Sequence, residues 1–132
     1  MIPSFTYNKT EKLKSRKELD KVFKAKKSFL IFPLKVFYLF SEISDDSLLR
    51  CGVGVGKKNF ANAVDRNRVK RLLREGYRLN KNPLHETVLQ KQLSFFVLYI
   101  DKNLPQSQAL MNEKMEQVIT KLNKRYADEM VV

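Results

Sequence analysis

The stretch from residue 63 to residue 80 constrains the fold most, because its apolar and cationic side chains separate when they are placed on a helix. At about 100° per residue, most cations fall on one arc and most apolar side chains on the opposite one. The apolar arc holds Val69, Leu72, Leu73, Gly76 and Leu79, and the cationic arc holds Arg66, Lys70, Arg74, Arg78 and Lys81, with Asn67, Arg71 and Tyr77 among or beside them. The pattern predicts a helix over 63–80 that packs its apolar side onto a core, with Asn62 as its N-cap.

The cationic arc indicates a partner with many negative charges. Like charges spaced i,i+4 repel each other, so such a strip destabilises an isolated helix. Arg68 adds a further cation off the main arc, toward the apolar side. The whole chain carries 26 Lys and Arg residues against 14 Asp and Glu residues, a formal net charge of +12. We therefore expect a polyanion to bind this helix, and nucleic-acid phosphate fits best.

Several classes of protein are disfavoured by what the sequence lacks. No apolar run approaches the ~20 residues of a membrane-spanning helix, and the first residues lack the order of a signal peptide. Cys51 is the only cysteine and His85 the only histidine, so we expect no intramolecular disulfide and no metal site. A protein nuclease is disfavoured because no Ser-His-Asp set, HExxH motif or P-loop is present. We expect a cytoplasmic protein with no membrane partner and no catalytic residue of its own.

Two further helices are predicted, one near each end of the chain. Ser15 and Glu18 fit a capping box, which predicts a following helix of about ten residues. Its inward face is predicted to carry Leu19, Val22 and Phe23. A last helix is predicted over 107–126. Residues 1–14 are basic and carry few apolar side chains, so we expect a mobile basic arm there.

Three strands are predicted from β-branched and aromatic content. The first covers residues 31–40, with Pro33 at its start or on an edge because proline cannot donate to a ladder. A polar turn at 41–47 suggests a hairpin to the second strand, 48–57. The third, 93–100, is a nearly continuous apolar run and suits burial on both faces.

The second strand carries three glycines on one face, at positions 52, 54 and 56. Glycine weakens a strand, so this arrangement calls for a physical reason. Close packing of a helix or a neighbouring backbone is one reason, and an open floor for a nucleic acid strand is the other. The sequence leaves both interpretations open.

These elements predict an α+β fold in which one small mixed sheet is packed with helices. The expected order is α-β-β-(β)-α-β-α, which allows one further short strand before the basic helix. We see no repeat and no second domain, so residues 1–132 are expected to form a single domain.

The basic helix and its flanks resemble the signature of the bacterial ribonuclease P protein subunit. The resemblance rests on Lys57-Lys58 and on residues 62–75, which read NAVDRNRVKRLLRE, and it extends over most of residues 13–125. It implies a fold like domain 2 of ribosomal protein S5, with a left-handed βαβ crossover. It also implies the protein component of an endoribonuclease (EC 3.1.26.5) that removes the 5′ leader from precursor tRNA. In that family the RNA subunit supplies catalysis and binds Mg²⁺.

The resemblance implies two sets of RNA-binding residues. Positions expected to dock on the ribonuclease P catalytic RNA are Lys57, Lys58, Arg66, Asn67, Arg68, Lys70, Arg71 and Arg74. Phe23 and Phe37 match aromatic positions in a cleft that binds the precursor tRNA 5′ leader. Plain core packing would also account for both aromatics, and the sequence leaves the two interpretations open.

The chain departs from the family pattern at three places. Leu19 stands where many members carry an aromatic residue, and Gly56 replaces a frequent serine. The loop at residues 59–61 is one residue longer than the common form and lacks its usual glycine.

The alternative function is a stand-alone basic RNA-binding or RNA-chaperone module, which the composition alone allows.

Overall fold

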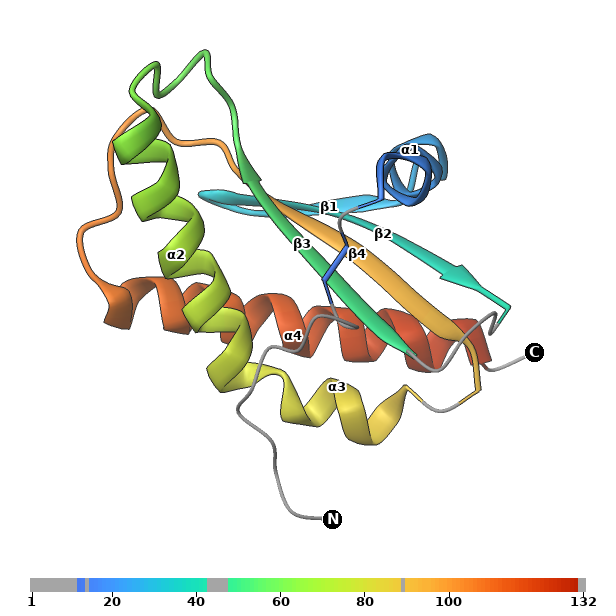
Figure 1. Cartoon of the computed structure of the whole chain (residues 1–132). Coiled ribbons are helices and arrows are strands. Elements are labelled where there is room, and N and C mark those ends of the chain that lie inside the picture. Colours follow the sequence, from blue (N-terminus) through green and yellow to red (C-terminus); the bar gives the residue numbers. More distant parts are fainter. Residues whose placement is uncertain (1–11, 14, 43–47, 89, 131–132) are drawn as a thin grey trace.

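The computed structural model describes residues 12–13, 15–42, 48–88 and 90–130. Its helices and strands form a mixed α+β arrangement, which confirms the predicted fold class (Figure 1). In chain order they are α1 (Arg16–Lys24), β1 (Ser28–Ile31), β2 (Leu34–Ser41), β3 (Leu49–Val55), α2 (Ala63–Asn80), α3 (Asn82–Thr87), β4 (Gln92–Tyr99) and α4 (Gln108–Met130).

The four strands form one sheet in the order β1-β2-β4-β3. β4 pairs antiparallel with β2 and parallel with β3, so it lies inside the sheet, as its apolar run predicts. Leu93, Phe95 and Val97 are fully buried on one of its faces. The parallel pair is joined by the crossover through α2 and α3. The left hand that the resemblance implies for this crossover stays a prediction.

Helices cover the two faces of the sheet unequally. α2 and α4 lie on one face, where the ring of Tyr77 packs 5.8 Å from that of Phe95 (Figure 1). α1 lies on the opposite face, where it packs on β2 and β4. Because successive side chains of a strand point to opposite faces, β4 contributes alternately to the core and to the partly open face under α1.

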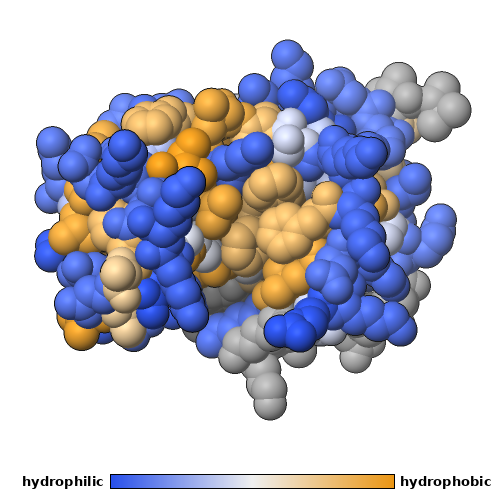
Figure 2. Space-filling view, turned by 90° about the horizontal axis from the view of Figure 1, so that it is seen from above, coloured by the Kyte–Doolittle hydropathy of each residue, from blue (hydrophilic) through white to orange (hydrophobic). Residues whose placement is uncertain are grey.

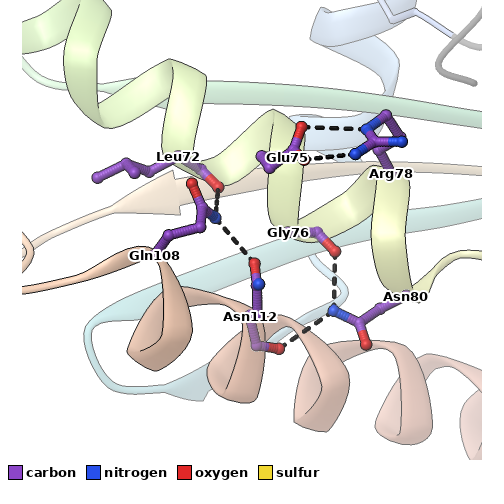
Figure 3. A network of polar contacts seen from close by, with 7 residues as sticks. All are labelled: Leu72, Glu75, Gly76, Arg78, Asn80, Gln108 and Asn112. Atoms are coloured by element: carbon purple, nitrogen blue, oxygen red, sulfur yellow. Dashed lines mark hydrogen bonds and ion pairs between the residues drawn. The ribbon is translucent and has the colours of Figure 1, made fainter. Parts of the chain in front are cut away.

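The contact between α2 and α4 combines close approach with side-chain hydrogen bonds (Figure 3). A Cβ added at Gly76 would lie 3.2 Å from an α4 side chain, so the missing side chain lets the helices approach. Asn80 Nδ2 donates to the carbonyls of Gly76 at 2.8 Å and Asn112 at 3.1 Å. Gln108 Nε2 donates to the Leu72 carbonyl at 3.0 Å and to Asn112 Oδ1 at 2.8 Å. These bonds fix α2 on the core.

The strand predicted over 31–40 is confirmed as β2 from residue 34 on, and its first residues belong to the end of β1 and to a turn. β1 and β2 pair antiparallel with Ile31 opposite Leu34, and Pro33 lies in the turn between them. Proline at the start of a strand was expected, because its nitrogen cannot donate to the ladder. The strand before the turn was missed, and the further short strand that the predicted order allowed lies here instead of before the basic helix.

The hairpin predicted between the strands over 31–40 and 48–57 is wrong. β2 and β3 are not neighbours, because β4 lies between them. The physical reason is burial, because the apolar segment 93–100 removes most apolar surface from water when it lies inside the sheet. Residues 43–47, on which most of the predicted turn falls, lie outside the described residues.

Helix termini follow the predictions in part. α2 has the predicted bounds, and Asn62 Oδ1 accepts from the Val64 amide at 2.8 Å. Ser15 is the N-cap of α1 but makes no side-chain capping bond, and the Glu18 carboxylate pairs instead with Arg50 on β3. The predicted capping box is therefore wrong, because a guanidinium across the sheet takes the carboxylate.

Three further differences concern segment ends. α3 was missed: Pro83 lies in its first turn, where a helix needs no backbone donor. α4 continues beyond the predicted end at residue 126 to Met130. The predicted arm lies outside the described residues except for Lys12 and Leu13. These two were expected to be mobile, but Lys12 bridges to Cys51, and Leu13 is buried and donates its amide to the Cys51 carbonyl at 3.0 Å.

Candidate nucleic-acid interface

Three phenylalanines meet on the sheet face under α1, and we call them the aromatic cluster. The ring of Phe23, from α1, lies 5.0 Å from that of Phe37 on β2 and 5.3 Å from that of Phe96 on β4. Both contacts are edge-to-face, the geometry that aromatic quadrupoles favour. Phe37 and Phe96 are directly opposite in the β2–β4 register. The structure therefore brings the predicted pair together and adds Phe96, which the sequence analysis missed.

The glycines of β3 make room for Phe96. A Cβ added at Gly52 would lie 2.8 Å from the Phe96 ring, and one added at Gly54 would lie 2.4 Å from it. At Gly56 the nearest atom would be the amide nitrogen of Lys58, at 4.0 Å. Close packing is therefore the reason for two of the three glycines, although the neighbour is a side chain on the adjacent strand. The glycines were a sequence signal for Phe96, because glycines on one face of a strand leave room for a large ring on the neighbouring strand.

The three rings differ in accessibility. Phe23 is 41% exposed, although an apolar side chain of its size is normally buried. Phe37 is half-buried, and the ammonium of Lys35 lies over its ring at 5.3 Å from the centroid. Phe96 is half-buried beside the glycines. Phe23 thus offers an open ring for stacking, and the other two support it.

The sheet face that carries the cluster is hollowed and has polar borders (Figure 2). Figure 2 shows this face as an apolar patch in a depression flanked by hydrophilic side chains. The exposed cations of α1 are Arg16, Lys17, Lys21 and Lys24. A pocket of about 440 Å³ also lies between α1 and the sheet, and Arg50, Gln92 and Ser94 line part of it. The face therefore combines an aromatic surface, a polar pocket and cations.

The cations of α2 divide into two groups. Arg66 Nη1 donates to the carbonyls of Phe60 at 2.8 Å and Ala61 at 2.7 Å, so this side chain holds the loop before the helix. Arg78 Nε donates to Glu75 Oε2 at 3.0 Å, and this bond holds the pKa of Glu75 below its usual range. The remaining predicted positions are outward-facing: Asn67, Arg68, Arg71 and Arg74 are exposed and Lys70 is half-buried.

Two residues predicted among the cations of this helix are in fact buried. Tyr77 has no exposed surface, because its ring packs against Phe95 of β4. Lys81 is also fully buried, with its ammonium 5.9 Å from the centroid of the Tyr77 ring. The helix ends at Asn80, so Lys81 leaves the extrapolated arc and follows the turn into α3.

The loop before α2 presents the predicted lysine pair. Lys57 and Lys58 are exposed, and the Gly56 carbonyl accepts from the amide of Asn59 at 3.3 Å. Asn59 Nδ2 donates to the Ile100 carbonyl at 3.2 Å, and Phe60 is buried. The longer loop without glycine is therefore tied to the end of β4.

Three other chemical features concern a thiol, metal ligands and membrane-spanning helices. The Cys51 thiol is buried and lies 3.8 Å from the Gly52 carbonyl as a donor. Within the described ranges, no three His, Cys, Asp or Glu side chains gather into a group that could hold a metal ion. None of the helices built from those residues is both long and apolar enough to span a bilayer.

Comparison with known proteins shows which family the chain resembles. A family model described as ribonuclease P matches residues 7–126. A ribonuclease P protein component of Porphyromonas gingivalis is 46% identical over 94 residues, which is 69% of this chain and 66% of that protein. One from Clostridioides difficile is 45% identical over 74 residues, which is 56% of this chain and 61% of that protein. Each match spans less than two thirds of the relative's length.

Solved structures agree on the fold. The RNase P protein from Thermotoga maritima superposes with a TM-score of 0.65 at 26% identity, covering 84% of this chain and 96% of that one. The Staphylococcus aureus RNase P protein at 2.0 Å gives a TM-score of 0.64 at 20% identity, covering 85% and 94% of the two chains, and shows the fold alone.

The contact between Gly54 and Phe96 can be tested by stability. Replacing Gly54 with alanine forces the Phe96 ring to move, and overpacking of this kind costs about 1–3 kcal/mol of unfolding free energy. The matched control is Gly56→Ala, where the nearest atom to the added methyl group would lie 4.0 Å away. Chemical denaturation of both variants should show a loss for Gly54→Ala and nearly no loss for the control. Equal stability of the two variants would contradict the packing described here.

Proposed function

The chain belongs to the ribonuclease P protein family, and we propose that it is the RNA-binding protein subunit of that ribonucleoprotein, assisting removal of the 5′ leader from precursor tRNA. The observation that carries this proposal is the aromatic cluster in its hollow, flanked by cations. A second basic surface on α2 lies on a separate element. Two surfaces of different chemistry suit two different RNAs.

We assign the hollow to the leader. A single strand is bound by stacking of its bases on aromatic rings and by cations along its backbone. Phe23 offers the exposed ring, and Phe37 and Phe96 hold it from below. Stacking contributes about 1–3 kcal/mol per base and tolerates every base. This tolerance suits an enzyme that meets many leader sequences.

We assign the outward surface of α2 to the catalytic RNA. The side chains proposed to contact its phosphates are Lys57, Lys58, Asn67, Arg68, Lys70, Arg71 and Arg74. Arg66 was predicted among them, and we keep it there as a residue that also fixes the loop carrying the two lysines. Five of the seven are fixed by one rigid helix, which reduces the entropy lost on binding.

Catalysis and metal binding are assigned to the RNA subunit. The family resemblance implies Mg²⁺ there, and the described side chains do not form a group that fits a metal ion. We therefore propose no magnesium ligand and no catalytic residue in this chain. We also propose that the protein acts in the cytoplasm, where precursor tRNA is processed in bacteria.

The proposed function is tested by leader cleavage. Bacterial ribonuclease P RNA is incubated with precursor tRNA at a few millimolar magnesium, with and without the protein. We expect the protein to raise the cleavage rate, because its cations offset the repulsion between two RNAs when magnesium is scarce. A folded protein that binds RNA but leaves the rate unchanged would contradict the proposal and favour the stand-alone RNA-binding or chaperone module.

The docking surface is tested by salt dependence. Arg71→Ala combined with Arg74→Ala should reduce the slope of log affinity for the catalytic RNA against log salt by roughly 1.4–1.8, for two lost phosphate contacts. The control is Lys102→Ala with Lys124→Ala, which removes the same charge from exposed positions off α2. Equal loss of slope in the two double variants would show that net charge alone binds the RNA.

A further inference from the structure

Lys26 has an unusual backbone conformation. Its φ is 59°, and it is the one non-glycine residue with positive φ in the part of the chain that the structure describes. This left-handed conformation carries a steric penalty for an L-residue, whereas glycine adopts it without that penalty. Sparsely populated backbone conformations of this kind cluster at functional sites.

The turn explains why residue 26 has a left-handed backbone but not why this residue is a lysine. α1 ends at Lys24, and the amide of its C-cap, Ala25, donates to the Lys21 carbonyl at 3.1 Å. The Lys27 carbonyl already accepts from the Tyr38 amide at 3.0 Å, so the chain reverses at Lys26. Glycine or asparagine is the usual residue at such a position. A cation favours the C-terminus of a helix, but Lys21 and Lys24 already lie in the last turn of α1.

Lys26 lies beside the aromatic cluster. It follows Phe23 by three residues and precedes Ser28, which is directly opposite Phe37 in the β1–β2 register. Its side chain is exposed. The next lysine turns elsewhere, since Lys27 Nζ lies 3.4 Å from a Glu129 carboxylate oxygen. Lys26 is therefore exposed and lies close to Phe23 in the chain and to Phe37 in the strand register.

We propose that Lys26 is a leader-binding residue whose ammonium contacts a backbone phosphate next to the nucleotide that stacks on Phe23. The inference rests on the proposed function and assigns it a further residue. Binding of the leader offsets the backbone penalty that the free protein carries. The same position therefore lowers stability and raises affinity.

The test separates these two effects. Lys26→Gly should raise the melting temperature of the free protein by about 2–5 °C, because the penalty disappears. The same variant, assembled with ribonuclease P RNA, should bind precursor tRNA more weakly and mature tRNA as before. The salt slope for the precursor should fall by about 0.7, the value for one contact with a single strand. Lys26→Asn should show the same loss of affinity, and Lys26→Arg should keep the affinity.

Two results would overturn the inference alone. One is a Lys26→Gly variant that keeps the precursor-to-mature affinity ratio, and the other is a variant that melts at a lower temperature than the wild type. A wild-type protein that does not distinguish precursor from mature tRNA would overturn the proposed function, and this inference with it. The wild-type measurement therefore separates the two failures.

Discussion

The position of β4 inside the sheet, between β2 and β3, is the constraint on which the rest of the structure depends. One face of this strand carries Leu93, Phe95 and Val97 into the core beneath α2 and α4. The other face carries Phe96 to the glycines of β3 and to the ring of Phe23. A single strand thus positions both the helix with the basic surface and the aromatic cluster.

The two surfaces also share their dependence on packing that is not itself functional. α2 is held by Gly76, Asn80 and the α4 amides, which leaves its outward side to cations that repel one another. α1 is held at one end by Glu18 and Arg50 and at the other by Phe23 on the sheet. Because the core fixes both helices, neither surface has to be ordered by the RNA that we propose it binds.

The sequence predicts elements well where periodicity is strong. The bounds of α2, its cap at Asn62 and the position of the glycine strand follow from local patterns, which need no knowledge of neighbours. The order of the strands does not follow, because the pairing of β4 between β2 and β3 depends on which segment gains most from burial. Long-range competition of this kind leaves no local signal.

The candidate site shows the same division. Phe23 and Phe37 were predicted from the family pattern, but Phe96 was missed because an unbroken apolar run hides which residue faces outward. Lys81 was placed among the cations because an ideal wheel extrapolates past the end of the helix, and Tyr77 because the wheel does not show that its ring packs on Phe95 of β4. The bonds from Arg66 to the preceding loop depend on the path of that loop beside the helix, and helical periodicity carries no information on this path.

The central claim is that the exposed Phe23 ring binds the leader by stacking. Its most direct test is the affinity of the assembled holoenzyme for precursor and for mature tRNA, with wild-type protein and with Phe23→Leu, which keeps an apolar side chain but removes the ring. The account predicts that precursor affinity falls by about 1–3 kcal/mol while mature tRNA affinity is unchanged. Equal losses for both tRNAs, or no loss for either, would show that Phe23 is a structural residue.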